Sequence, residues 1–271
     1  MKNKISCFII AKNEEKLISK AILSVVKIVD EVIVIDSGSV DDTPRIAENL
    51  GAKVVYNQWQ GYVQQKIFGE KLCSHEWILN IDADEELSLD LQNEISYIFQ
   101  SQLQNKFKGY KLNIVITMPG DDKPRLLAPS NCAIRLYNKQ YISFSNVDTK
   151  STTHDSALLK NTPEKGNILT LLSPVYHLSS ISIIQLVNKI NFYTTEQAKD
   201  LVNSSRFVSN FRIGAEFFWW FLKAYFLRRY FVFGFKGFIY SVIFAFGKFL
   251  RLAKVYELRC DNTNSHIKDE K

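Results

Sequence analysis

The segment from residue 77 to residue 86, which reads WILNIDADEE, constrains the fold of this chain more than any other stretch. A largely apolar run, typical of a buried strand, ends at Asp82 and Asp84 with one small residue between them. Two carboxylates this close repel each other unless a cation neutralises them. Mg²⁺ prefers oxygen ligands and is often held by one or two carboxylates together with substrate phosphates. The simpler alternative is an acidic turn that leads into a helix at Ser88.

Strands and helices alternate through the N-terminal part of the chain. Apolar, β-branched runs predict strands at residues 5–11, 31–36, 53–56 and 77–81. Helical spacing and helix start signals predict helices at residues 13–27, after the opening residues 41–44, at 61–72 and at 88–100. This alternation predicts βαβ units, and therefore an α/β fold whose mostly parallel sheet is flanked by helices.

Polar side chains stand at the ends of these predicted strands. Asn13 follows the first strand, Asp36 ends the second, and Asp82 and Asp84 follow the fourth. Open α/β sheets bind their ligands beyond the carboxyl ends of the strands. We therefore expect these side chains to meet at one ligand-binding edge, which favours a site over an isolated acidic turn.

Two common nucleotide-binding motifs are missing from the sequence. No Gly-x-Gly-x-x-Gly follows the first strand, and no Gly-x-x-x-x-Gly-Lys-[Ser/Thr] occurs. Dinucleotide-dependent oxidoreductases and P-loop enzymes are therefore disfavoured. A nucleotide bound here would be held by side chains, backbone and a metal ion.

The positive charge of the chain belongs to its C-terminal part. The net charge is +6, and residues 206–259 hold ten Lys/Arg but only two Asp/Glu. The remainder is slightly acidic, so the composition argues against a nucleic-acid-binding core and for a basic appendage. Residues 208–256 are apolar and aromatic as well, and they predict two helices broken near Gly234 and Gly237.

Three segments together resemble family 2 glycosyltransferases with the GT-A fold. They are residues 9–15 (IIAKNEE), 34–39 (VIDSGS) and 80–85 (NIDADE), in that order and spacing. A closer resemblance is to the lipopolysaccharide core β-1,4-glucosyltransferase group. It is carried by Trp59-x-Gly61-Tyr62 with Gln65-Lys66, and by the aromatic and basic tail after Phe217. The likeness covers most of the chain and is strongest over residues 5–95.

The resemblance implies a donor site for a UDP-sugar. Asp36 matches the aspartate that hydrogen-bonds the nucleotide base, although it could instead cap the following turn. Asn13 and Glu14 belong to the same site, with Glu14 near the ribose or base or, alternatively, a first-turn helix acid. Lys66 matches a basic position near the nucleotide or diphosphate, and its alternative is an exposed helix lysine.

The same resemblance assigns Asp82 and Asp84 to a divalent metal, Mg²⁺ or Mn²⁺, and to the donor diphosphate. Asp84 is the expected direct ligand. The family shows a His-Glu pair after an Arg-Leu-Phe-like strand, and here Arg135-Leu136-Tyr137 is followed by His154-Asp155. Asp155 is therefore the expected catalytic base and His154 its orienting neighbour, the alternative being a polar loop pair. His177 matches a family histidine, which we interpret as a core residue.

The sequence also departs from the group. Asn131 and Ala133 stand where an Asp and a Gln are usual, and Asp155 stands where Glu is usual. This leaves open a non-catalytic, membrane-peripheral subunit that binds a nucleotide-sugar. Transfer to a polyprenyl phosphate is the nearest enzymatic alternative. A metal-dependent nucleotidyltransferase fits the aspartate pattern less well.

We expect three regions and one principal activity. Residues 1–205 form the GT-A domain, residues 206–259 form basic, aromatic helices that associate with membranes, and residues 260–271 form a polar, disordered tail. The expected activity is inverting, metal-dependent transfer of a glucose-like sugar to a lipid-linked envelope saccharide such as lipopolysaccharide core. The four widely spaced cysteines favour a reducing, cytoplasmic location.

We expect the C-terminal helices to bind the inner face of an anionic membrane without crossing it. The uncharged stretch from Gly237 to Gly247 is bounded by Lys236 and Lys248. A spanning helix needs about 20 predominantly apolar residues, so this stretch is too short. Lys236 and Lys254 are predicted to share one helix face that meets anionic lipid.

Overall fold

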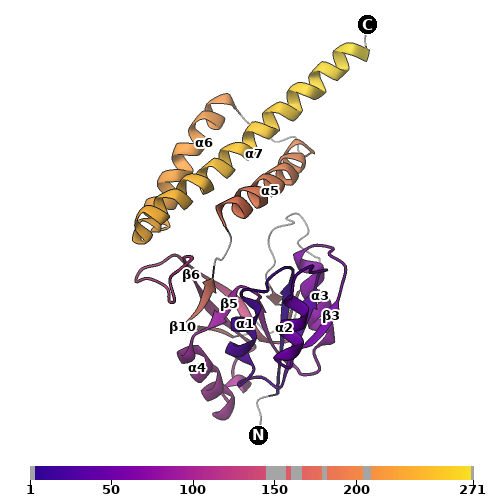
Figure 1. Cartoon of the computed structure of the whole chain (residues 1–271), viewed down its shortest axis with the longest axis vertical. Coiled ribbons are helices and arrows are strands. Elements are labelled where there is room, and N and C mark those ends of the chain that lie inside the picture. The colour runs from indigo at the N-terminus through magenta and orange to yellow at the C-terminus, as the bar shows by residue number, and fades with distance from the viewer. Residues whose placement is uncertain (1–3, 145–156, 160–166, 179–181, 204–208, 270–271) are drawn as a thin grey trace. The chain divides into compact units, whose positions relative to one another are not determined.

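The computed structural model describes residues 4–144, 157–159, 167–178, 182–203 and 209–269 (Figure 1). The chain divides into two compact units, which are described separately. Unit 1 comprises residues 1–124 and 130–180, and unit 2 comprises residues 125–129 and 181–271. The segment expected to hold the base, including His154 and Asp155, lies outside the described residues.

An eight-stranded mixed sheet forms the centre of unit 1, in the order β3-β2-β1-β4-β7-β6-β10-β5. Its strands are β1 (Ile5–Ala11), β2 (Glu31–Asp36), β3 (Lys53–Tyr56), β4 (Trp77–Asp82), β5 (Glu85–Leu87), β6 (Gly109–Thr117), β7 (Ser130–Asn138) and β10 (Ile168–Leu178). The first four strands in the order are parallel, as the alternation predicts. Strand β7 runs antiparallel to β4 and β6, and β5 runs antiparallel to β10. A separate two-stranded sheet pairs β8 (Ile142–Ser143) with β9 (Leu158–Leu159).

Helices cover both faces of this sheet because its strands are apolar on both sides. Helices α1 (Ile18–Val25), α2 (Thr43–Asn49) and α4 (Leu89–Gln100) pack on one face, and α3 (Tyr62–Leu72) packs on the other. Adjacent strand residues separate the two cores, with Ile9 in the first and Phe8 in the second. Helix α3 comes close to β1 at Gly69, where an added Cβ would lie 2.6 Å from the Phe8 ring.

The C-terminal part of unit 2 contains the helices α5 (Ile183–Asn203), α6 (Asn210–Leu222) and α7 (Gly234–Asp269). Lys223–Leu227 forms a π-helical turn and Tyr230–Phe233 a 3₁₀ turn before α7. The break near Gly234 agrees with the sequence, since Gly234 has a positive φ of 60°. Two boundaries differ from expectation: α5 belongs to unit 2 because it packs on α7, and α7 continues past residue 260 to Asp269.

Small residues form the buried stripe of α7. Gly237, Ser241 and Ala245 recur every four residues and are all buried. A Cβ added at Gly247 would lie 2.8 Å from Ile190 of α5, so the two helices approach closely there. Lys254 donates to the carbonyl and side-chain oxygens of Asn191 and to the Thr194 and Thr195 hydroxyls, at 2.7–3.0 Å. Its ammonium therefore fastens α7 to α5 and does not belong to the expected lipid-facing group.

Among the described residues, one helical stretch, Tyr230–Cys260, is long and apolar enough to cross a membrane. This property follows from length and composition alone. It differs from the expectation drawn from the uncharged stretch Gly237–Gly247, because the apolar region continues beyond that stretch.

Candidate functional site

The carboxyl ends of β1, β2 and β4 lie side by side at one edge of the sheet. Ala11 is in register with Asp36 of β2, and Ile10 is in register with Asp82 of β4. The loops that begin at these positions therefore start from neighbouring points. This is the convergence that the strand-end pattern predicts.

Asp36 organises the turn that follows β2. Its carboxylate accepts hydrogen bonds from the backbone N–H groups of Gly38 at 3.0 Å and Ser39 at 3.1 Å, and from the Ser39 hydroxyl at 2.5 Å. Gly38 has a φ of 88°, which suits glycine and lets its N–H point at the carboxylate. The buried aspartate thus has the turn-capping contacts that the sequence offered as the alternative, and any base contact would use its remaining lone pairs.

The loop after β1 is tied to the same turn. Asn13 adopts a left-handed backbone, with a φ of 57°, and its side-chain oxygen accepts from the Val40 N–H at 2.9 Å. Its own N–H donates to the Ser39 hydroxyl at 2.9 Å. The N–H of Glu14 donates to the Thr43 hydroxyl at 2.7 Å. These hydrogen bonds join the loops after β1 and β2 into one rim, which contains Asn13, Glu14 and Asp36.

Gln65 of α3 extends this rim to a third strand end. Its side-chain amide donates to the Ser37 hydroxyl at 3.1 Å and to the Asn57 carbonyl at 2.9 Å. The Asn57 amide donates in turn to the Gln65 side-chain oxygen at 2.5 Å. Because Gln65 is fully buried, these bonds fix α3 and the next residue, Lys66, against the edge of the sheet.

Asp82 forms the centre of a charged network. Its carboxylate lies 3.1 Å from the Lys66 ammonium and 2.7 Å from the Arg135 guanidinium. Arg135 also lies 2.7 Å from Glu85 and donates to the Asn80 side-chain oxygen at 2.9 Å. Lys66 is fully buried and is therefore not the exposed helix lysine of the alternative interpretation. The network neutralises Asp82 with a lysine and an arginine.

The electrostatics of the two buried acids differ. Burial opposes ionisation of Asp82, but the charges of Arg135 and Lys66 hold its pKa well below the usual range. Burial raises the pKa of Glu85 to about 7, because Arg135 offsets it only in part and the charges of Asp82 and Asp84 add to it. Asp82 is therefore a fixed negative charge, whereas Glu85 gains a proton more readily.

Asp84 pairs with a histidine that lies far away in the sequence. Its carboxylate lies 3.0 Å from Nε2 of His177, and both side chains are partly exposed. Antiparallel pairing of β5 with β10 places His177 opposite Glu85, and the Leu178 N–H donates to the Asp84 carbonyl at 2.8 Å. Burial lowers the pKa of His177, but the hydrogen bond and charge of Asp84 outweigh it and raise the pKa to about 9.

The donor set at this edge fits a hard divalent cation that is shared with a ligand. Asp84 supplies a carboxylate and His177 an imidazole, both at the partly open end of the network. Among the described residues, no group of three or more His, Cys, Asp or Glu side chains could hold a metal. A cation here would therefore complete its shell with water or substrate phosphates, as Mg²⁺ commonly does.

Two residues of this site were not predicted in these roles. His177 was interpreted as a core residue, yet it faces Asp84. Arg135 received no role, although a single arginine within an apolar strand signals a buried ion pair. Asn131 and Ala133, where the sequence departs from the group, lie on β7 in register with Ile114 and Leu112.

Comparison with known proteins identifies relatives along nearly the whole chain. The family model "Glycosyl transferase family 2" matches residues 6–102. An uncharacterized glycosyltransferase of Rickettsia typhi is 56% identical over 96% of this chain and 89% of its own length. The lipopolysaccharide core biosynthesis glycosyltransferase LpsC of Rhizobium meliloti is 25% identical over 98% of this chain and 96% of its own.

Among solved structures, glucosyl-3-phosphoglycerate synthase of Mycobacterium tuberculosis, in complex with Mn²⁺, UDP-glucose and phosphoglyceric acid, is 26% identical. That match covers 44% of this chain and 45% of the other, with a TM-score of 0.33. The likeness therefore extends over less than half of either chain.

Proposed function

Because this chain belongs to glycosyltransferase family 2, we propose that it transfers a sugar from a UDP-sugar to a lipid-linked saccharide of the cell envelope, with inversion at the anomeric carbon. The observation that carries the proposal is the pairing of Asp84 with His177 beside the neutralised Asp82. The similarity to LpsC supports a lipopolysaccharide-core type of acceptor.

Asp84 and His177 would hold a divalent cation, Mg²⁺ or Mn²⁺. When bound, the cation neutralises charge that develops on the leaving diphosphate. Asp82 keeps its place through Lys66 and Arg135, so it can orient the donor without changing its own protonation. The rim formed by Asn13, Glu14 and Asp36 would hold the nucleoside.

The acceptor hydroxyl needs a base, which we assign to Asp155, with His154 as its orienting neighbour. This assignment rests on the sequence alone. We expect Asp155→Asn to lower turnover by about 10²–10⁴-fold with little effect on donor binding, because the amide cannot accept the proton. Activity that survives in Asp155→Asn and disappears in His154→Ala would move the role to His154.

Unit 2 would attach the enzyme to the cytoplasmic face of the membrane. Its exposed large apolar side chains include Phe218, Trp219 and Phe226, which suit the headgroup boundary. We favour attachment at the surface over a span for Tyr230–Cys260, because Lys248 and Arg251 would lie within the span. A charge at the centre of a membrane helix costs at least about 2.5 kcal/mol.

A nucleotide-sugar screen by protein thermal stability tests the donor assignment. A ligand that binds only the native state adds about 2.7 kcal/mol at a hundred times its Kd. We expect stabilisation by UDP-sugars that requires Mg²⁺ or Mn²⁺. It should disappear in Asp84→Asn and persist in Asp90→Asn, the same change at an exposed aspartate of α4. Equal stabilisation with and without metal would contradict the assignment.

Acceptor specificity separates the remaining alternatives. Product formed with a core saccharide but not with a polyprenyl phosphate supports the proposed acceptor. Product formed only with a polyprenyl phosphate would make that compound the acceptor instead. Donor binding without turnover on any acceptor would favour the non-catalytic subunit, for which the altered residues Asn131 and Ala133 are the sequence basis.

A further inference from the structure

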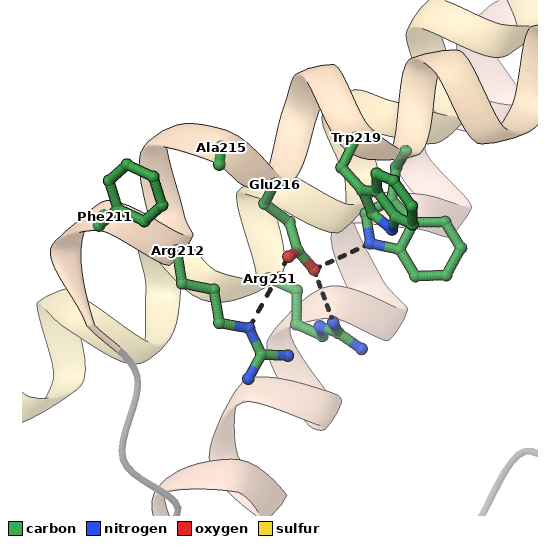
Figure 2. A pocket seen from close by; sticks show the side chains of 7 residues that line it. Phe211, Arg212, Ala215, Glu216, Trp219 and Arg251 are labelled. Carbon is green, nitrogen blue, oxygen red and sulfur yellow. Dashed lines mark hydrogen bonds and ion pairs between the residues drawn. The ribbon is translucent and has the colours of Figure 1, made fainter.

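Five cations of unit 2 gather where α6 and the turn after it pack against α7. This cation cluster consists of Arg212, Lys223, Arg228, Lys248 and Arg251. One buried carboxylate, that of Glu216, lies among them: it is 3.3 Å from Arg251 and 3.9 Å from Arg212, and it accepts from the Trp220 indole at 3.0 Å (Figure 2). The cluster therefore keeps a large excess of positive charge.

Aromatic rings hold the other cations in place. The Lys223 ammonium lies 4.4 Å from the centroid of the Trp220 ring, and the Lys248 ammonium lies 5.1 Å from it. Lys248 is also 5.2 Å from the Phe244 ring, over which Arg228 lies at 4.9 Å. Cation–π contacts of this kind position a cation without cancelling its charge.

The residues of the cluster have the same spacing on α6 with its following turn as on α7. Glu216, Trp220 and Lys223 follow each other at four and three residues, and Phe244, Lys248 and Arg251 repeat that spacing on α7. Residues so spaced lie on one side of a helix. Each helix therefore presents its aromatic and charged residues of the cluster on one side.

Three of the five cations have no carboxylate partner within the part of the chain that the structure describes. There, Lys223, Arg228 and Lys248 form no ion pair with a carboxylate. Burial lowers the pKa of Lys248, and the neighbouring charges of Arg251 and Arg228 lower it further. Like charges held this close favour an incoming anion that relieves their repulsion.

An open groove with apolar walls adjoins the cluster. It has a volume of about 400 Å³ and is lined by Phe211, Arg212, Ala215, Glu216, Trp219, Trp220 and Arg251 (Figure 2). The exposed side chains of Phe211 and Trp219 form its apolar part, whereas Arg212 and Arg251 bring positive charge to it. A ligand that fits has both an anionic group and an apolar group.

We propose that the cation cluster binds the phosphate of an anionic phospholipid headgroup, with the apolar part of the lipid against Phe211 and Trp219. Arginine and lysine bind phosphate strongly, arginine through its forked donors. Charge complementarity and the amphiphilic groove together select a lipid over a soluble anion. The proposal deepens the membrane attachment proposed above, and it does not depend on the sugar donor.

Flotation with vesicles tests this site. The full chain is mixed with vesicles of phosphatidylcholine alone, or with added phosphatidylglycerol. We expect Lys248→Gln to weaken binding to the anionic vesicles by roughly ten- to hundredfold, the loss of one charge-assisted contact. The matched control, Lys199→Gln, removes the same charge from an exposed position of α5 and should cost at most about fivefold. Equal losses in both variants would overturn the site and leave only a diffuse charge effect.

Two further arms identify the ligand and keep the test interpretable. Vesicles in which oleate supplies the same surface charge should bind more weakly than phosphatidylglycerol vesicles, and equal binding would contradict phosphate recognition. Inorganic phosphate that displaces the protein fully at matched ionic strength would assign the site to a free anion instead. Lys248→Arg should restore binding if Lys248→Gln acts through its charge, and failure to restore it would count against the site.

The same variants separate this proposal from the proposed activity. Metal-dependent stabilisation by a UDP-sugar should be unchanged in Lys248→Gln, since Lys248 belongs to unit 2 and the donor residues to unit 1. Loss of vesicle binding with intact donor binding supports the lipid site. Absent donor binding with intact vesicle binding would instead refute the proposed UDP-sugar donor and leave this site standing.

Discussion

The two units of this protein differ in where their large apolar side chains lie: more of them are buried in unit 1, and more of them are exposed in unit 2. In unit 1 the buried side chains are large, and Phe8, Ile9, Ile33 and Leu79 are fully or almost fully inside. In unit 2, alanines are prominent among the buried apolar residues, including Ala198, Ala224 and Ala245. Its large side chains are outside instead: unit 2 holds 17 of the 26 exposed large apolar residues of the described chain, although it is the smaller unit.

The proposed membrane attachment of unit 2 accounts for this difference. Water drives large apolar side chains inward, as in unit 1. Where the surroundings are apolar, helices associate through small residues that let backbones approach, as Gly237, Ser241 and Ala245 do on α7. The small buried residues of unit 2 agree with the membrane attachment proposed above, and substitutions in the two units test this difference.

The largest expected effect contrasts two phenylalanines. Phe8→Ala should lower the free energy of unfolding of unit 1 by about 3–5 kcal/mol, because it empties a site packed against Gly69. Phe218→Ala should change the stability of unit 2 by no more than about 0.5 kcal/mol, since this side chain is exposed. Urea unfolding followed by circular dichroism measures both. A similar loss in the two variants would mean that the exposed aromatics serve folding and not lipid binding.

The next effect separates the two units by function. Asp84→Ala should weaken metal-dependent donor binding by more than about 100-fold, because losing even an outer-shell contact costs about 10–100-fold in metal affinity. Its binding to anionic vesicles should remain unchanged. Isothermal titration with UDP-sugar and Mn²⁺ measures the first property, and flotation measures the second. A variant that loses both properties would show that the units do not act independently.

A smaller effect concerns the close packing of α7. Ala245→Leu should destabilise unit 2 by about 1–3 kcal/mol, because the added atoms have no room in the buried stripe. Phe246→Leu, at the exposed neighbouring position, is the control and should change stability by no more than about 0.5 kcal/mol. Thermal unfolding monitored by helical circular dichroism compares them. If Ala245→Leu proves neutral, the small-residue stripe is not a packing surface.

The smallest effect concerns the proton on His177. In chelator-treated protein the imidazole should stay protonated until pH approaches its pKa of about 9. This raised pKa stabilises the folded state fully below the unfolded value of about 6.5, and the contribution is lost as pH rises through about 9. Mg²⁺ with UDP should lower the apparent pKa by about one unit or more, since metal and proton compete for Nε2. Histidine NMR titration measures the shift, with His177→Gln for assignment. An unchanged titration would remove His177 from the metal site.

The first four strands and the polar residues at their ends could be predicted from short stretches of sequence. The apolar runs of β1 to β4 and the polar residues at their ends could be recognised in the sequence, and parallel pairing then aligned them. Strand β5, with three residues, is too short to give a periodic signal. The contact of Asp84 with His177 depends on the antiparallel register of β5 and β10, which no local pattern specifies.

The charged residues illustrate the same limit. Asp82 was expected to share a metal with Asp84, but Lys66 and Arg135 neutralise it through contacts between strands and helix that are distant in sequence. Lys254 was expected to face lipid because its spacing from Lys236 places both on one helix side. Its ammonium bonds to α5 instead, because α5 packs on α7 and presents four oxygen acceptors to it.

The partners of Lys254 are neutral oxygens, which has a consequence for how the protein would leave a membrane. Salt weakens attraction between separated charges but has little to screen in a short hydrogen bond to an uncharged acceptor. A rise in ionic strength would therefore loosen the cation cluster from lipid while α5 stays fastened to α7. Release would be a change of location without unfolding, so one population of enzyme could move between the cytoplasm and the bilayer and return intact.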